Sequence, residues 1–274
     1  MALYSTESAK IVLVILAVIA TPLASGLIAG LVHRMRLRQQ GEREPSILQP
    51  FVDFRQMFRQ QPGSANDTAM LAVLLQLAFA MVSLLLLVLG RNLLAALALQ
   101  LFSGLVAIVA AGNRNPGFID QQRLNPLKQY LTYQPVVLLA AAGCGLVAGS
   151  FGVDAMLGQN RPLIVELPLV WLSLLYAAHV FSGVATEADL AGPVLAVARL
   201  AGCFRQAGLL LFAGLFAADS LIMAGLIAIL LGYGLFAAEC MANRFYCRVM
   251  AIWGWRLIYF ACAINLTWIY IKYQ

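Results

Sequence analysis

Long apolar runs separated by short polar segments dominate the pattern of this chain. Eight runs approach the roughly 20 residues that an α-helix needs to cross about 30 Å of hydrocarbon. Helices and closed barrels are the structures that satisfy their backbone hydrogen bonds within lipid, so these runs predict transmembrane helices. We expect the spans near residues 11–32, 68–90, 93–112, 131–150, 164–184, 205–218, 221–241 and 249–271.

The two least regular runs are the first and the sixth. The first follows "MALYSTESAK", which is a poor basic leader, and its apolar stretch continues past 20 residues, so we expect a true span and not a cleaved signal peptide. The sixth, 205–218, is short and has Arg205 at its edge. Little chain is left outside the runs. We therefore expect an all-α integral membrane protein of about eight spans that forms a single polytopic domain over residues 1–274.

Composition supports a membrane protein over a soluble one. Apolar residues make up 62% of the chain and charged residues 11%, with a mean hydropathy of +0.85, against about 45–50% and about 25% in soluble domains. The five cysteines are scattered without a C-x-x-C spacing, so we expect no metal site in this chain. They are Cys144, Cys203, Cys240, Cys247 and Cys262.

The distribution of basic residues predicts the orientation, because cytoplasmic loops carry an excess of Lys and Arg. One set of alternate loops, with their span edges, holds thirteen basic residues: Arg34, Arg36, Arg38, Arg43, Arg55, Arg59, Arg114, Arg123, Lys128, Arg199, Arg205, Arg244 and Arg248. The other side holds four: Lys10, Arg91, Arg161 and Lys272. We therefore expect a multi-pass protein of a bacterial or archaeal inner or plasma membrane, with both termini outside.

The first polar segment, residues 33–61, contains a second pattern besides its charge. In "SILQPFVDFRQMFRQQ", Ile47, Phe51, Phe54 and Phe58 recur at helical spacing among Gln, Asp and Arg residues. Pro50 suits a first helical turn. The pattern predicts a short amphipathic helix in the membrane interface, with arginines toward headgroups or a partner. A helix that merely covers the end of the bundle would show the same pattern.

Two loops resemble one protein family. "RLRQQGEREPSILQPFVDFRQMFR" is similar to the first cytoplasmic loop of the NADH dehydrogenase subunit 1 (NuoH) family, and "AAECMANRFYCRVM" is similar to its Glu-x-x-Met-Ala-(x)-Arg stretch. The second is closest to the form in Ech-type and formate hydrogenlyase complexes, and the whole chain matches the family loosely. The family features in this sequence are Arg36, Arg38, Gly41, Arg43, Pro45, Leu48, Gln49, Pro50, Phe51, Asp53, Glu239, Met241, Ala242 and Arg244.

The resemblance implies a non-catalytic membrane subunit in a complex-I-like, energy-converting [NiFe] hydrogenase, including formate- and CO-linked types. Such a subunit docks the soluble electron-transfer arm and couples redox chemistry to proton or sodium translocation. Its partners would be hydrogenase-like large and small subunits and other membrane subunits; iron–sulfur clusters and the NiFe centre would lie in those partners, with no cofactor in this chain. The implied docking residues are Arg34, Arg36, Arg38, Arg43, Pro45, Gln49, Pro50, Phe51, Asp53, Arg55 and Arg244.

Two departures from the family separate this chain from its complex I members. The third cytoplasmic segment keeps only Glu187 and Asp189 as acidic residues, and the second has Gln134-Pro135 where relatives carry an acidic pair. We therefore expect no quinone site. Ionisable groups within membranes are costly and usually functional, which makes the few that remain proton-relay candidates: Glu239, His179, Glu187 and Asp189.

Three alternatives stay open. A NuoH-type subunit of respiratory complex I is the nearest. A cytochrome b is suggested by His33 and His179, since haem can be held between histidines of two helices, although both lie toward span ends. A secondary transporter would use helix breaks such as Pro22, Pro135 and Pro168, but no internal repeat is visible and the two matched loops have no part in that function.

Overall fold

The protein is helical throughout the part that the structure describes. The computed structural model describes residues 7–41, 46–60, 67–112, 121–159, 161–182, 190–242 and 248–273. Within these ranges the sole extended pairing is an isolated bridge between Asn92 and Gly152. The helices are α1 (Glu7–Gln40), α2 (Gln49–Arg59), α3 (Asp67–Val88), α4 (Leu93–Gly112), α5 (Gln121–Ala148), α6 (Val153–Leu157), α7 (Leu163–Glu166), α8 (Pro168–Ser182), α9 (Gly192–Leu215), α10 (Leu221–Ala242) and α11 (Arg248–Tyr273).

Each of the eight predicted runs overlaps one of the long helices. Four helices are both long and apolar enough to cross a membrane over their described residues: Lys10–Met35, Thr68–Val88, Tyr130–Ala148 and Gly192–Leu215. Three further apolar stretches are shorter: Leu93–Val109, Pro168–Ala178 and Leu221–Leu235. The structure therefore confirms an all-α membrane protein, while the number of eight spans stays a prediction.

The predicted start of the sixth run, 205–218, was wrong. Its helix α9 begins at Gly192, with Pro193 in the first turn, and Arg205 lies in the middle of the helix. Polar residues at 199, 205 and 206 end the apolar run in the sequence, but α9 lies in the centre of the bundle, where other helices supply contacts for them. A hydropathy sum along the chain does not include those contacts.

Two other boundaries differ from the prediction. Helix α1 continues to Gln40, so Arg34, Arg36 and Arg38 lie on the helix and not in a loop. It ends at Gly41, whose φ of +73° is the left-handed conformation that commonly terminates helices. The fifth predicted run, 164–184, is divided at Leu167 into α7 and α8, because Pro168 cannot supply an N–H to continue the first helix.

The centre of the bundle is built from α3, α4 and α9. Helix α3 packs mainly against α4 and α9, and α10 packs against α9. Large fully buried side chains include Leu97, Phe212 and Phe216. Two of them, Phe212 and Phe216, pack with their rings tilted by 60° and their centroids 5.5 Å apart. In the most apolar window of α9, 56% of residues are buried, against none in that of α1.

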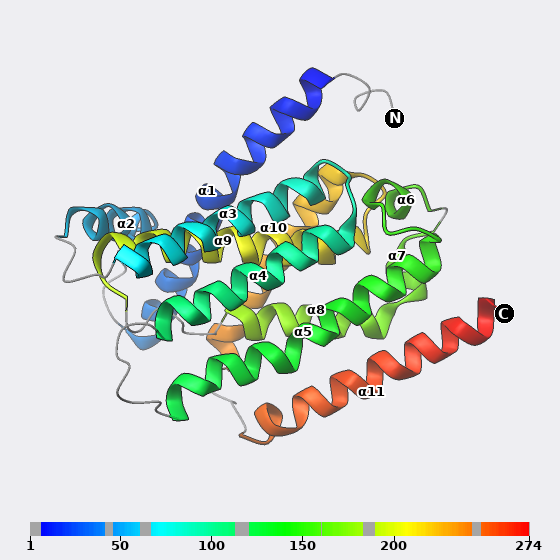
Figure 1. Ribbon diagram of the computed structural model, residues 1–274. Coiled ribbons are helices and arrows are strands. Elements are labelled where there is room, and N and C mark those ends of the chain that lie inside the picture. The colour runs from blue at the N-terminus through cyan, green and yellow to red at the C-terminus, as the bar shows by residue number, and fades with distance from the viewer. Residues whose placement is uncertain are drawn as a thin grey trace.

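Figure 1 shows where the outer helices lie. Helix α11 runs along one edge, packed on α5 and α8, while α1 crosses the bundle near α10, α9 and α2. Helix α2 lies at one end of the bundle, and α6, α7 and the C-terminal end of α11 lie at the other (Figure 1). The basic segment and the C-terminus are thus at opposite ends, as the predicted topology requires.

Candidate functional site

The predicted amphipathic helix exists and begins where Pro50 was expected to place its first turn. Helix α2 covers Gln49–Arg59 with Pro in its first turn. Gln49 Nε2 donates a hydrogen bond to Asp53 Oδ1 at 2.8 Å, one turn further along. Phe54 and Phe58 meet edge to face with ring centroids 5.1 Å apart. These contacts stabilise the short helix locally.

Two glycines of α1 seat the segment that carries α2. A Cβ added at Gly26 would come within 2.5 Å of the Phe51 ring, and one added at Gly30 would overlap the carbonyl oxygen of Ile47. The glycines lie one helical turn apart on the same face of α1, so they leave room for both groups. Close approach of a backbone is a common reason for glycine in a helix. Gly26 and Gly30 thus fix how α2 lies on α1.

The outer surface of this region is basic. Arg38 on α1 and Arg55 and Arg59 on α2 are exposed, and Arg34 is half-buried. Arg199 of α9 donates from Nη1 to Met57 Sδ at 3.7 Å, which joins the central helix to α2. We call the exposed face of α2 with the end of α1 the docking surface, after the role predicted for it from the sequence. The side chain of Arg36 is not described, and Arg43, Pro45 and Arg244 lie outside the described residues.

The described part of the chain does not test the predicted proton-relay residues. His179 and Glu239 lie on α8 and α10, but their side chains are not described, and Glu187 and Asp189 lie outside the described ranges. These assignments therefore stay predictions. Among the described residues, the buried polar side chains are all uncharged: Gln76, Ser83, Gln100, Ser103, Gln134, Ser173 and Asn265.

Several of these uncharged groups connect the central helices. Ser103 Oγ donates to the carbonyl oxygen of Gln76 at 3.0 Å, and Tyr130 Oη donates to that of Leu101 at 2.9 Å. Gln100 Nε2 donates to the carbonyl oxygen of Arg205 at 2.6 Å. Its Oε1 is buried without a hydrogen-bond partner among the described residues. Side-chain to backbone bonds of this kind hold α3, α4, α5 and α9 together within the membrane.

A cavity of about 580 Å³ lies behind the docking surface. Helices α1, α2 and α9 form most of its wall, and Gln76 of α3 and Ala178 of α8 complete it. Its charged and titratable lining residues are His33, Asp53, Arg199 and Arg205, with Cys203 beside them. The volume is in the range of small-molecule sites. Arg199 and Arg205 had been interpreted only as topology signals. The sequence indication that they line a site was the presence of Arg199, Arg205 and Gln206 inside an otherwise apolar stretch.

A second cavity, of about 320 Å³, lies between α1, α9 and α10. Its wall is mainly aliphatic, with residues such as Leu13, Leu210 and Ile229. It extends from the middle of α1 toward the end of the bundle that carries α6 and α7, away from the docking surface. A groove of this composition accepts hydrocarbon.

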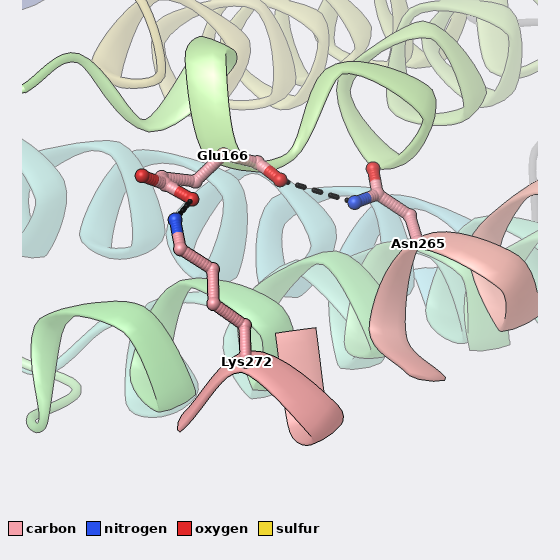
Figure 2. Close-up of polar contacts among 3 residues, drawn as sticks. All are labelled: Glu166, Asn265 and Lys272. Atoms are coloured by element: carbon pink, nitrogen blue, oxygen red, sulfur yellow. Dashed lines mark hydrogen bonds and ion pairs between the residues drawn. The ribbon is translucent and has the colours of Figure 1, made fainter. Parts of the chain in front are cut away.

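The opposite end of the bundle contains a polar cluster around Asn265 of α11. Asn265 Nδ2 donates to the carbonyl oxygen of Glu166 at 3.0 Å (Figure 2). Its Oδ1 accepts from the backbone N–H groups of Leu169 and Val170 at 3.0 and 3.3 Å. Asn265 thereby satisfies backbone groups on both sides of the break between α7 and α8, the role that a capping residue has within one helix. In the sequence, the one indication of this cluster was the amide of Asn265 within the apolar stretch "AINLTW".

An ion pair lies next to this cluster. Lys272 Nζ contacts Glu166 Oε2 at 2.5 Å, and the two side chains are 43% and 13% exposed (Figure 2). Lys272 had been assigned to the outer side of the membrane. Neither the pair nor any other described part of the chain forms a metal site, since no group of three or more His, Cys, Asp or Glu side chains gathers within the described residues.

Comparison with known proteins identifies the fold alone. No protein-family model matches the chain, and no curated protein matches it by sequence. Its structure is similar to a chain of the membrane-bound sulfane sulfur reductase, an archaeal respiratory membrane complex, with a TM-score of 0.74. The alignment covers 95% of this chain and 99% of the other at 15% sequence identity. The two chains therefore share one helical architecture over nearly their whole lengths.

Proposed function

We propose that this protein is a non-catalytic membrane subunit of a complex-I-like respiratory complex, in which it docks a soluble redox arm onto the membrane arm. The observation that carries the proposal is the fold shared, nearly end to end, with a chain of an archaeal respiratory membrane complex. The resemblance of the first loop and of the segment around Glu239 to the NuoH family agrees with it.

The docking surface supports this role. Arg38 at the end of α1 and Arg55 and Arg59 on α2 are exposed, where a soluble partner can reach them. The two glycines of α1 and the contact from Arg199 to Met57 fix α2 against the membrane-embedded helices. A fixed basic surface suits electrostatic recognition of an acidic partner surface, which directs association and register more than it adds affinity.

For the soluble arm we propose hydrogenase-like large and small subunits, with iron–sulfur clusters and a NiFe centre in those partners. A sulfur-reducing arm is the second candidate, because the structural neighbour belongs to a sulfane sulfur reductase. The purified complex separates the two: with a low-potential electron donor, a hydrogenase arm evolves H₂, and a sulfur-reducing arm reduces a sulfane sulfur compound instead. Reduction of a soluble quinone analogue, blocked by complex I inhibitors, would contradict both and favour complex I.

The test of docking is charge reversal on the docking surface. In the complex purified in mild detergent, Arg38→Glu with Arg55→Glu is expected to release the soluble subunits while the other membrane subunits stay together. The matched control is Arg91→Glu with Arg161→Glu, which changes two exposed arginines elsewhere on the chain. If the soluble arm remains bound and active in the Arg38→Glu, Arg55→Glu variant, the docking role is wrong, and the basic residues serve only to set the topology.

We further propose that the chain couples redox chemistry to translocation of H⁺ or Na⁺, with Glu239, His179, Glu187 and Asp189 as relay candidates. Glu239→Gln keeps the size of the side chain but cannot carry a proton. A relay predicts an assembled complex with normal redox activity and no ion uptake into vesicles. A structural ion pair with Arg244 predicts poor assembly instead, since breaking a buried pair costs about 3–5 kcal/mol. Normal assembly with normal uptake would contradict both roles.

A further inference from the structure

The two cavities adjoin each other inside the bundle. Both are lined by Ser25 of α1 and Gln206 of α9, so the wall of one continues into the wall of the other. The larger cavity lies behind the docking surface at the end that carries α2. The smaller one continues between α1 and α10 toward the other end. Together their linings follow α1 from Leu13 to His33, and we refer to the two cavities as one space along the inner side of that helix.

The two parts of this space differ in chemistry. The larger cavity has Arg199, Arg205 and His33 in its lining, and its carboxylate, Asp53, already accepts a hydrogen bond from Gln49. The smaller one is lined mainly by leucine, isoleucine and alanine. A molecule that fills both must therefore carry an anionic or strongly accepting group at one end and hydrocarbon at the other. Membrane phospholipids with an anionic headgroup have this form, and basic pockets between helices on the cytoplasmic side recognise such headgroups.

We propose that this space is a binding site for an anionic phospholipid. Its phosphate lies against Arg199 and Arg205 in the larger cavity, and one acyl chain lies in the groove between α1 and α10. Arginine suits this role because its planar guanidinium group donates paired hydrogen bonds to phosphate oxygens. The orientation agrees with the predicted topology, since the headgroup is at the basic end of the bundle and the chain extends toward the membrane interior.

The position of the site gives the lipid a structural role. Helix α1 contributes no buried residue in its most apolar window, and it carries the glycines that seat the docking surface. A lipid between α1 and the pair α9–α10 would fill the space along that helix and join it to the centre of the bundle. This inference concerns the membrane-embedded part of the chain and does not depend on the identity of the soluble arm.

The first test measures phospholipid retained by the purified complex. The complex is exchanged into micelles that contain either phosphatidylglycerol or phosphatidylcholine, washed, and its bound phospholipid is quantified by mass spectrometry. We expect phosphatidylglycerol to be retained in preference. Arg199→Gln with Arg205→Gln should lower that retention by about tenfold or more. The control, Arg91→Gln with Arg161→Gln, should leave it unchanged.

A second pair of variants tests the groove without removing charge. Gly225 lines the smaller cavity, and a Cβ there meets nothing within 4 Å; Gly234, on the same helix, also has open space around its Cβ but does not line the cavity. Gly225→Leu should block the acyl chain, and Gly234→Leu should not. Both changes replace glycine by a better helix former, so neither should unfold α10.

Thermal unfolding measures phospholipid binding to these variants. A ligand that binds the folded state raises Tm as its concentration increases. Phosphatidylglycerol should therefore raise Tm of the wild type and of Gly234→Leu, and raise that of Gly225→Leu much less. Equal retention of both phospholipids by the wild type, or unchanged retention of phosphatidylglycerol in both the arginine and the Gly225 variants, would overturn the proposal. Recovery of a neutral isoprenoid compound from the site instead of phospholipid would overturn it as well.

Discussion

The first and last long helices, α1 and α11, both present broad apolar faces to the outside, yet they attach to the bundle differently. Helix α11 is joined by hydrogen bonds: Asn265 spans the α7–α8 break, and Tyr259 Oη donates to the carbonyl oxygen of Thr132 at 2.6 Å. Helix α1 lies close to its neighbours through small residues, at Gly26 and Gly30, and borders both cavities. Directional bonds fix one position of a helix within lipid, whereas small residues and cavities leave space for another molecule.

The largest effect is expected where one side chain satisfies the most backbone groups. Asn265→Leu leaves the N–H groups of Leu169 and Val170 and the carbonyl of Glu166 without their partner. We expect the free energy of unfolding to fall by roughly 3 kcal/mol, because each unsatisfied buried group costs about 1–3 kcal/mol and the broken helix can relax in part. Denaturant titration in detergent measures it. Thr267→Val, at an exposed position of α11, is the control and should change little.

The next effect should appear at the contact between α1 and α2. Gly30→Ala places a Cβ against the backbone carbonyl of Ile47, which has no flexible side chain to move away. We expect α2 to shift from α1 at a cost of about 1–3 kcal/mol, as for other overpacked sites. Limited proteolysis near α2 should accelerate and the soluble arm should bind more weakly. Gly234→Ala has open space and serves as the control; equal protease sensitivity of the two variants would contradict the seating role.

A smaller effect is expected at Gln100, a second buried amide that contrasts with Asn265. Its Nε2 bonds to the carbonyl of Arg205, but its Oε1 has no partner among the described residues. Gln100→Met removes the hydrogen bond to Arg205, which destabilises the fold, and the unsatisfied acceptor Oε1, whose removal stabilises it. The two contributions to the free energy of unfolding are of similar size. We therefore expect the free energy of unfolding to change by less than about 1 kcal/mol. A loss as large as that of Asn265→Leu would indicate that a further group, such as an ordered water, binds Oε1.

The smallest effect should come from Lys272 beside Asn265. Its ion pair with Glu166 is close, but the Lys272 side chain is 43% exposed. Solvent and salt screen such pairs, which contribute about 0–1 kcal/mol. Lys272→Gln should therefore lower the free energy of unfolding by about 0.5 kcal/mol or less at moderate ionic strength. Comparison with Asn265→Leu then shows whether α11 depends on buried hydrogen bonds or on its terminal charge.

The sequence by itself determined the helical membrane class and the places of the helices. Run length and apolarity are local properties, so each predicted run overlapped a helix, and Pro50 marked the first turn of α2. The grouping of basic residues at one end also followed from the sequence, since it depends on alternation of loops. The relay roles of Glu239, His179, Glu187 and Asp189 stay predictions, as does the docking role of every residue assigned to it, and Arg43, Pro45 and Arg244 also lie outside the described residues.

Only the tertiary structure decided what happens where helices meet. Arg205 stood at the first edge of a predicted span, yet it lies in the middle of α9. There its carbonyl oxygen accepts a hydrogen bond from Gln100 of α4, and the residue lines the larger cavity. Asn265 hydrogen-bonds to the backbone at the break between α7 and α8, where its partner Glu166 lies 99 residues earlier in the chain. The adjoining cavities arise where α1 and α9 lie side by side, with α2 closing the larger one and α10 the smaller one. Such features depend on groups far apart in sequence, and a pattern read along the chain sums only neighbouring residues, so it contains no record of which distant groups become partners.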